Sequence, residues 1–273
     1  MSTATSPKSV TEVPFWMGTA TIFRREFFAF FTTPVAAIFL VIFLVMSGVM
    51  TFNVGRLVDP QGEASLRSFF NWHPWLYLFL VPALSMRLWA DEHRLGTLEL
   101  LTTLPLSMID LVLGKFLAAW SFAALALALT FPVWLTVSYL GNPDHGVIAA
   151  GYVGSVLLSG GFLAVGSAVS AVSHNQVVAF VLSVAACFFL LLTGWGPVQS
   201  FFNGWLPPAM SEVMASISFM SHFVDSFVRG VIDVRDLVFF ATVIAAGLWI
   251  TGCLLYTSPS PRDQRGSRMP SSA

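Results

Sequence analysis

The side chains best suited to chemistry gather in one polar stretch of this chain, ADEHRLGTLELLTTLP at residues 90–105. This stretch carries five ionisable side chains: Asp91, Glu92, His93, Arg94 and Glu99. Carboxylates beside a histidine are potential metal ligands, but three consecutive residues lack the spacing by which a protein surrounds a metal ion. The sequence therefore predicts neither catalytic residues nor a metal site, and the charges of this stretch require another explanation.

The composition places the chain in a membrane. Of its 273 residues, 56% are hydrophobic and only 10% are charged, whereas soluble domains carry roughly 25% charged residues. The net charge of −1 lacks the basic excess of nucleic-acid-binding proteins, so no nucleic-acid partner is expected. Cys187 and Cys253 both fall in apolar runs, and two cysteines suggest neither a disulfide framework nor a metal site.

The apolar runs predict the fold. A spanning helix needs about 20 apolar residues, and six runs approach or exceed that length. They predict an all-α membrane protein with six transmembrane helices, at residues 34–52, 73–89, 111–140, 147–172, 177–195 and 237–256. Lys and Arg near the ends of these runs are more numerous on the side that carries both termini. The positive-inside rule therefore places both termini, and residues 90–105 with them, in the cytoplasm.

The segments outside the predicted spans differ in character. Residues 19–31 place Arg24, Arg25 and Glu26 among apolar residues at helical spacing, which favours an amphipathic helix in the membrane interface over a basic flank that only orients the first span. Residues 196–236 predict short extracytoplasmic helices that lie at or dip into the membrane. In this segment we expect a solvated polar face, formed by His222, Asp225 and Arg229.

The two ends of the chain are predicted to be disordered. Residues 1–18 are rich in Ser and Thr and contain no sustained apolar run, so a cleaved signal peptide is not expected. Residues 257–273 consist largely of Ser, Pro and Arg without periodicity. This tail resembles translated sequencing-adapter read-through, and we assign it no function.

The predicted spans offer little to a chemical mechanism. Ionisable residues are nearly absent from them, which argues against transport driven by protons or sodium and against an intramembrane protease. The run at 147–172 instead spaces small residues for close helix packing, within the bundle or between two copies: Gly154, Gly161, Gly166 and Ser170. No P-loop motif occurs, so the energy for any active transport must come from another subunit.

The polar stretch at 90–105 also contains a short apolar stripe. Leucines recur at helical spacing for about two turns, at Leu95, Leu98, Leu101 and their neighbours. Gly96 relaxes the helix near its start, and Pro105 ends it. A helix this short and apolar cannot span a membrane. It needs a hydrophobic groove, on its own membrane domain or on a soluble partner.

At this point the sequence resembles the permeases of ABC-2-type transporters. The resemblance is carried by a pattern after the second span, formed by Glu92, Gly96, Thr97, Leu98, Glu99, Leu100, Leu101 and Pro105. The Gly114-Lys115 pair, RREFFAFFTTPVAA at 24–37 and SFMSHFVDSFVRGVIDVRDLVFF at 218–240 are also similar to segments of that family. The resemblance covers residues 15–256, and its nearest branch is the gliding-motility-associated group, close to the permease of nitrous-oxide-reductase maturation.

The resemblance implies a permease domain at residues 19–256 in a bacterial inner membrane. Its cytoplasmic coupling helix, residues 91–105, is expected to dock in a groove of a separate ABC ATPase, with acids such as Glu92 and Glu99 facing basic residues of that partner. The chain itself would bind no cofactor and perform no enzymatic reaction, because ATP and Mg²⁺ belong to the ATPase. A second permease copy, identical or related, would complete an exporter.

Two other functions remain open at the level of sequence. The chain can be a membrane anchor that assembles a cytoplasmic ATPase complex without transporting anything, since the same docking segment serves that role. A membrane-embedded enzyme is disfavoured, because the acidic group at 91–93 lacks a metal-binding arrangement. Nothing in the sequence identifies a transported substrate.

Overall fold

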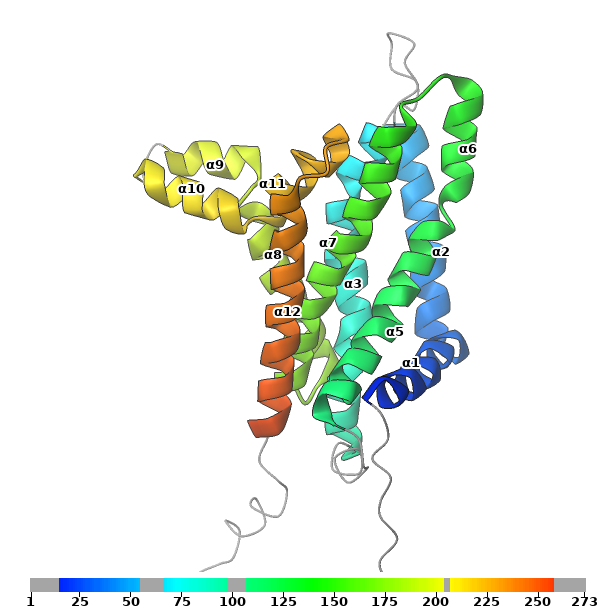
Figure 1. Cartoon of the computed structure of the whole chain (residues 1–273), viewed down its shortest axis with the longest axis vertical. Coiled ribbons are helices and arrows are strands. Elements are labelled where there is room, and N and C mark those ends of the chain that lie inside the picture. Colours follow the sequence, from blue (N-terminus) through cyan, green and yellow to red (C-terminus); the bar gives the residue numbers. More distant parts are fainter. Residues whose placement is uncertain (1–14, 55–65, 98–106, 204–206, 258–273) are drawn as a thin grey trace, which may run out of the picture.

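The computed structural model describes residues 15–54, 66–97, 107–203 and 207–257. All regular elements in these ranges are helices, and most of them stand side by side in a bundle (Figure 1). Helix α1 (Phe15–Thr32) lies across the lower end of this bundle, and we call that end the α1 end. The predicted disordered termini, 1–18 and 257–273, fall almost entirely outside the described residues.

The first spanning helix follows α1 after a sharp change of direction. Helix α2 (Pro34–Val49) begins with a proline, and a proline disfavours helical geometry in the residue before it. Thr33 is accordingly extended, with φ −103° and ψ 135°, so the chain leaves the crosswise α1 and enters the upright α2. The α2 helix continues into a short π-helical turn, η1 (Met50–Val54).

The remaining helices complete the bundle and a group of short helices at the opposite end. The longer ones are α3 (Arg67–Leu95), α5 (Met108–Ala128), α6 (Phe131–Leu140), α7 (His145–Val172), α8 (Gln176–Leu192) and α12 (Val234–Thr257). The segment predicted to hold short helices contains α9 (Gly196–Asn203), α10 (Pro208–Ile217), α11 (Phe219–Val224) and the 3₁₀ turn η2 (Phe227–Arg229). These short elements lie at the end of the bundle away from α1 (Figure 1).

The described helices confirm a helical membrane protein. Four stretches are long and apolar enough to cross a bilayer: Pro34–Phe52, Met108–Leu140, His145–Val172 and Val234–Thr257. They coincide with four of the six predicted spans. The other two predicted spans correspond to α3, whose length of 29 residues includes a charged final turn, and to α8, which is apolar but only 17 residues long. Six spans therefore stay a prediction.

Helix α3 differs from its prediction at its end. The sequence suggested that a separate helix begins near Asp91, but Asp91 to Leu95 form the last turn of α3. Gly96 then stops the helix with φ +67°, a left-handed conformation that glycine adopts without steric cost. The charged residues extend the helix because a spanning helix can continue into water without losing its backbone hydrogen bonds. Gly96 therefore ends a helix instead of relaxing the start of one.

Helix α7 is the centre of the bundle because its small residues let neighbours approach closely. It contacts α3, α5, α8 and α12. A Cβ added at Gly154 would lie 2.5 Å from the Cβ of Phe227, and one at Gly166 would overlap the Ser85 hydroxyl. Ser170 is fully buried, and its hydroxyl donates to the carbonyl of Met86 at 3.1 Å. With Gly161, also buried, these residues pack inside the chain and not on its surface.

This packing predicts a graded response to added methyl groups. Gly154→Ala should lower the free energy of unfolding by about 1–3 kcal/mol, because Phe227 must shift to admit the Cβ. Gly161→Ala should cost less, since its nearest neighbour is a ring atom of Phe219 at 3.3 Å. Gly48→Ala is the control, because nothing lies within 4 Å of its added Cβ. Thermal unfolding in detergent measures the series; equal effects at the three glycines would contradict the packing.

Candidate functional site

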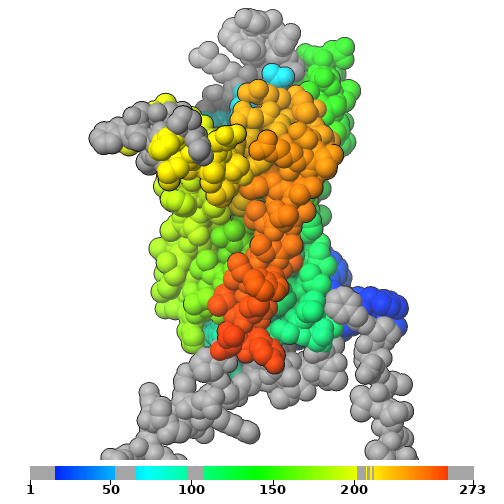
Figure 2. Space-filling view, turned by 60° about the vertical axis from the view of Figure 1, so that its left-hand side comes forward, coloured from blue at the N-terminus to red at the C-terminus, as the bar shows by residue number. Residues whose placement is uncertain are grey.

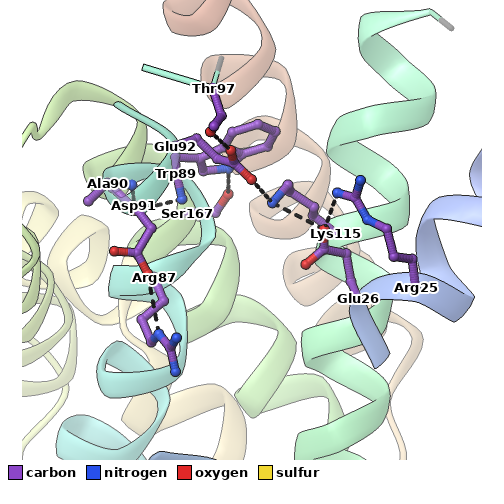
Figure 3. A network of polar contacts seen from close by, with 11 residues as sticks. Arg25, Glu26, Arg87, Trp89, Ala90, Asp91, Glu92, Thr97, Lys115 and Ser167 are labelled. Carbon is purple, nitrogen blue, oxygen red and sulfur yellow. Dashed lines mark hydrogen bonds and ion pairs between the residues drawn. The ribbon is translucent and has the colours of Figure 1, made fainter. Parts of the chain in front are cut away.

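A buried lysine joins three helices at the α1 end. Lys115 on α5 has only 4% of its side chain exposed. Its ammonium lies 2.9 Å from Glu92 Oε1 on α3 and 3.4 Å from Glu26 Oε1 on α1 (Figure 3). The face of the Trp89 ring lies 5.5 Å from the same nitrogen. A buried ammonium is stable only when it is paired, and here two carboxylates and an aromatic face surround it. We call this cluster the Lys115 network.

The neighbour of Lys115 lets α1 come close enough to take part. A Cβ added at Gly114 would lie 2.7 Å from Ile22 Cγ2 and 3.1 Å from the carbonyl of Thr19, both on α1. Only glycine fits this contact. The two residues therefore act together: Gly114 admits α1 against α5, and Lys115 binds the Glu26 side chain that α1 brings. A polar contact fixes the same crossing, since Thr19 Oγ1 donates to Asp110 Oδ1 at 2.7 Å.

The beginning of α5 is fixed by a capping box. The Ser107 hydroxyl accepts a hydrogen bond from the backbone N–H of Asp110 at 3.1 Å. In return, the Asp110 carboxylate accepts from the backbone N–H of Ser107 at 3.3 Å. Two of the unpaired N–H groups at a helix start are satisfied in this way. Asp110 thus caps α5 and binds α1 at once, which sets the position of Lys115 one and a half turns further along.

The end of α3 is closed around Glu92. The N–H groups of Gly96 and Thr97 donate to the carbonyls of His93 and Glu92, at 3.4 and 3.1 Å. The Thr97 hydroxyl also donates to the Glu92 carboxylate. The spacing of Glu92, Gly96 and Thr97 therefore serves a local contact. Gly96 reverses the chain at the end of α3, and this reversal brings the Thr97 hydroxyl to the carboxylate of Glu92.

The other side of the α3 end contacts α7 and α8. Asp91 accepts hydrogen bonds from Arg87 at 3.3 Å and from the side chain of Gln176 at the start of α8. The His93 Nε2 lies 2.9 Å from the carbonyl of Ala171, and its ring stacks on His174 with centroids 4.9 Å apart. The last turn of α3 thus contacts three other helices: Glu92 binds Lys115 on α5, Asp91 binds Gln176 on α8, and His93 contacts Ala171 on α7.

The environment shifts the pKa of two groups that lie beyond the predicted span. Burial raises the pKa of Glu92, but the Lys115 ammonium and the Thr97 hydrogen bond outweigh it and hold that pKa below its ordinary value. The pKa of His93 is lowered chiefly by burial, against the opposing effect of its contact with the Ala171 carbonyl. At neutral pH, Glu92 is therefore an ion and His93 is uncharged.

The charges line part of a small cleft. Its volume is about 150 Å³, and its polar walls come from Glu26, Thr33, Arg87, Asp91, Glu92 and Lys115. The carboxylates that line it are bound to the chain's own cations. Among the described residues, no group of three or more His, Cys, Asp or Glu side chains is arranged to hold a metal ion. The network joins α1, α3 and α5.

The structure brings together part of the predicted site. Glu92 and Glu26 belong to the Lys115 network, and Arg25 pairs with Glu26 at 2.6 Å. Thr97 binds Glu92, and Gly96 ends α3 between them. Arg24 is exposed on α1. The other predicted coupling residues lie outside the described residues: Leu98, Glu99, Leu101 and Pro105. Glu92 was expected to face a partner protein, whereas its carboxylate binds Lys115 and Thr97 of this chain.

Sequence reasoning missed the central role of Lys115 and Trp89. Lys115 was noticed only as part of a motif near the end of a span. The available signal was its position in an apolar helix, where a lysine is costly without partners. Trp89 donates its indole N–H to Ser167 Oγ at 3.1 Å, so the ring that faces Lys115 is itself anchored to α7.

A second buried ionisable pair lies at the opposite end of the bundle, and it corrects one prediction. His222 was expected on a solvated face, but its Nδ1 lies 2.6 Å from Asp236 Oδ1, and both residues are buried. Its ring also stacks on Phe239 with centroids 3.9 Å apart. Asp225 and Arg229 do lie on the surface, as an exposed pair at 3.0 Å. His222 thus fastens α11 to α12.

A scan against protein-family models found no match. A search of curated proteins likewise returned no significant match.

The Lys115 network predicts a strong effect of removing its cation. Lys115→Met leaves the carboxylates of Glu26 and Glu92 facing each other, so the free energy of unfolding should fall by about 3–5 kcal/mol. The double variant Lys115→Met/Glu92→Gln should regain part of this loss, because it removes the acid that is left without a cation, whereas Glu26 still pairs with Arg25. Arg229→Met, at the exposed pair with Asp225, is the control and should change stability by less than about 1 kcal/mol. Chemical or thermal unfolding of the full chain in detergent measures all three.

The lowered pKa of Glu92 predicts a pH dependence with a definite sign. Because the folded-state pKa lies below that of the unfolded chain, the stabilisation is complete above about pH 4.5 and is lost as the pH falls further. The difference in melting temperature between the wild type and Glu92→Gln should therefore shrink below that pH. A difference that stays constant down to pH 3, roughly a unit below the ordinary pKa, would contradict an ionised Glu92 in this network.

Proposed function

We propose that this chain is the membrane-spanning permease subunit of an ABC exporter, and that a separate ATPase drives it through residues 91–105. In this proposal α3 and α8 are spans as well, which gives six. Both termini and the α1 end face the cytoplasm of a bacterial cell, and α9 to α11 lie on the outer side. The partner ATPase binds ATP and Mg²⁺, and a second permease copy completes the pathway.

The observation that carries this proposal is the way both ends of the segment 98–106 are fixed. On one side, Thr97 binds Glu92, which binds Lys115 on α5. On the other side, Ser107 binds Asp110, which binds Thr19 on α1. A docking segment can transmit force only when the elements on both sides of it are held rigidly. The Lys115 network supplies this connection, and it links the segment to α1, α3 and α5 together.

The charge distribution supports an outside source of energy. The sequence has no P-loop, so the chain needs a partner to use ATP. Arg87, Asp91, Glu92 and Lys115 are bound to one another or to neighbouring helices, instead of lining a route through the bilayer. This arrangement fits a subunit that is moved by a partner better than one that is driven by the passage of ions.

Substitutions in the segment test the proposal. Glu99→Arg or Leu98→Arg should abolish co-purification of the ATPase with the tagged full chain, and should reduce stimulated ATP hydrolysis to the level of the ATPase alone. The charge or bulk of arginine opposes a fit into the partner's groove. Asp225→Arg is the control, because it makes the same change on the exposed surface of the opposite end. Retention of the ATPase by both segment variants would overturn the docking assignment.

The alternative function, a membrane anchor for a cytoplasmic ATPase complex, makes the same docking prediction. It differs from the permease only in that nothing is transported. The close packing of α7 against its four neighbours favours a rigid support within one copy. Reconstitution of the chain with its ATPase in liposomes separates the two functions. ATP-dependent export of lipid or solute supports the permease, whereas ATP hydrolysis without any flux supports the anchor.

A further inference from the structure

An apolar groove separates α5 from α12 near the α1 end. Its volume is about 490 Å³, and side chains such as Ile109 and Val112 on α5 face Leu248 and Gly252 on α12 across it. Figure 2 shows the face on which these two helices lie beside each other, with α12 in orange to red. The groove lies on the side of α5 that the Lys115 network does not use.

The groove exists because the two helices pack on different neighbours. Helix α12 follows α7: a Cβ added at Gly247 would lie 2.8 Å from the Cβ of Ala164, and Thr251 lies 3.3 Å from Ser167. Helix α5 is instead held against α1 through Gly114. The contacts that position each helix therefore hold them apart at this end, and nothing in the described part of the chain fills the space between them.

The shape and chemistry of the groove match one leaflet of a bilayer. From Leu248 to Thr257 the wall on α12 measures about 14 Å at 1.5 Å per residue, close to half of the roughly 30 Å hydrocarbon core. The groove begins where both helices reach polar residues, Ser107 before α5 and Thr257 at the end of α12. Tyr256, with 84% of its surface exposed, stands at that level, where membrane proteins place aromatic residues.

We propose that this groove binds one acyl chain of a phospholipid from the leaflet at the α1 end. Both walls belong to helices of spanning length, and the groove is continuous with their exposed apolar surfaces, such as Trp249 and Ile109. The bound chain completes the packing between α5 and α12. Lipid binding in this groove does not require the proposed ATPase.

Two glycines allow a matched test. Neither Gly252, in the groove, nor Gly48, on α2, has any atom within 4 Å of an added Cβ, so a side chain can begin at both positions without a clash at its Cβ. Gly252→Phe fills the groove, whereas Gly48→Phe adds the same ring to the surface of another span. Native mass spectrometry of the full chain, released from detergent with palmitoyl-oleoyl phosphatidylethanolamine added, counts the lipids that remain bound.

The expected result is one retained phospholipid in the wild type and in Gly48→Phe, and loss of that lipid in Gly252→Phe. Equal retention in all three proteins, or no retention in any, would overturn the proposal. Cys253, which lines the groove and is exposed, provides a separate check. Efficient oxidative cross-linking of Cys253 between two copies in a bilayer would identify the groove as a protein interface and also overturn the proposal.

Discussion

The arrangement at the α1 end depends on one requirement, that the ammonium of Lys115 be neutralised inside an apolar protein. Neither carboxylate that meets it is near in sequence: Glu92 lies 23 residues before it, and Glu26 lies on the first helix. The requirement therefore draws α1 and α3 onto α5. It also accounts for the extension of α3 beyond its apolar part, because Glu92 reaches Lys115 only from the final, charged turn.

Hydroxyl groups connect the Lys115 network to the rest of the bundle. Trp89, whose ring faces Lys115, donates to Ser167, and Ser167 contacts Thr251 on α12 at 3.3 Å. Ser170 accepts from the backbone N–H of Trp89 at 3.2 Å. Such contacts replace the hydrophobic driving force, which is weak between helices that are surrounded by lipid. The small residues of α7 make them possible by letting α3 and α12 approach closely.

The sequence predicts four long apolar helices that the structure contains, because hydropathy and length are local properties. Helices could be predicted without any knowledge of their neighbours in space at residues 34–52, 111–140, 147–172 and 237–256. Pro34 likewise marked the start of α2. The polar contacts were not predictable in the same way. The pairing of Lys115 with Glu26 depends on which helices become neighbours, and a single sequence carries no such information. For the same reason, His222 was wrongly placed on the surface, since nothing local indicates Asp236 as its partner.

Helix α5 unites the two unusual features of the α1 end. One side of its first turns holds Lys115 and the contacts to α1 and α3, while the other side lines the apolar groove against α12. A displacement of residues 98–106 would act on α5 through Ser107 and its capping box. On its charged side α5 is bound by short, directional contacts that resist sliding. On its apolar side it meets a space that we assign to lipid, which deforms easily. Polar contacts therefore tie the first turns of α5 to α1 and α3, whereas toward α12 these turns present only apolar side chains.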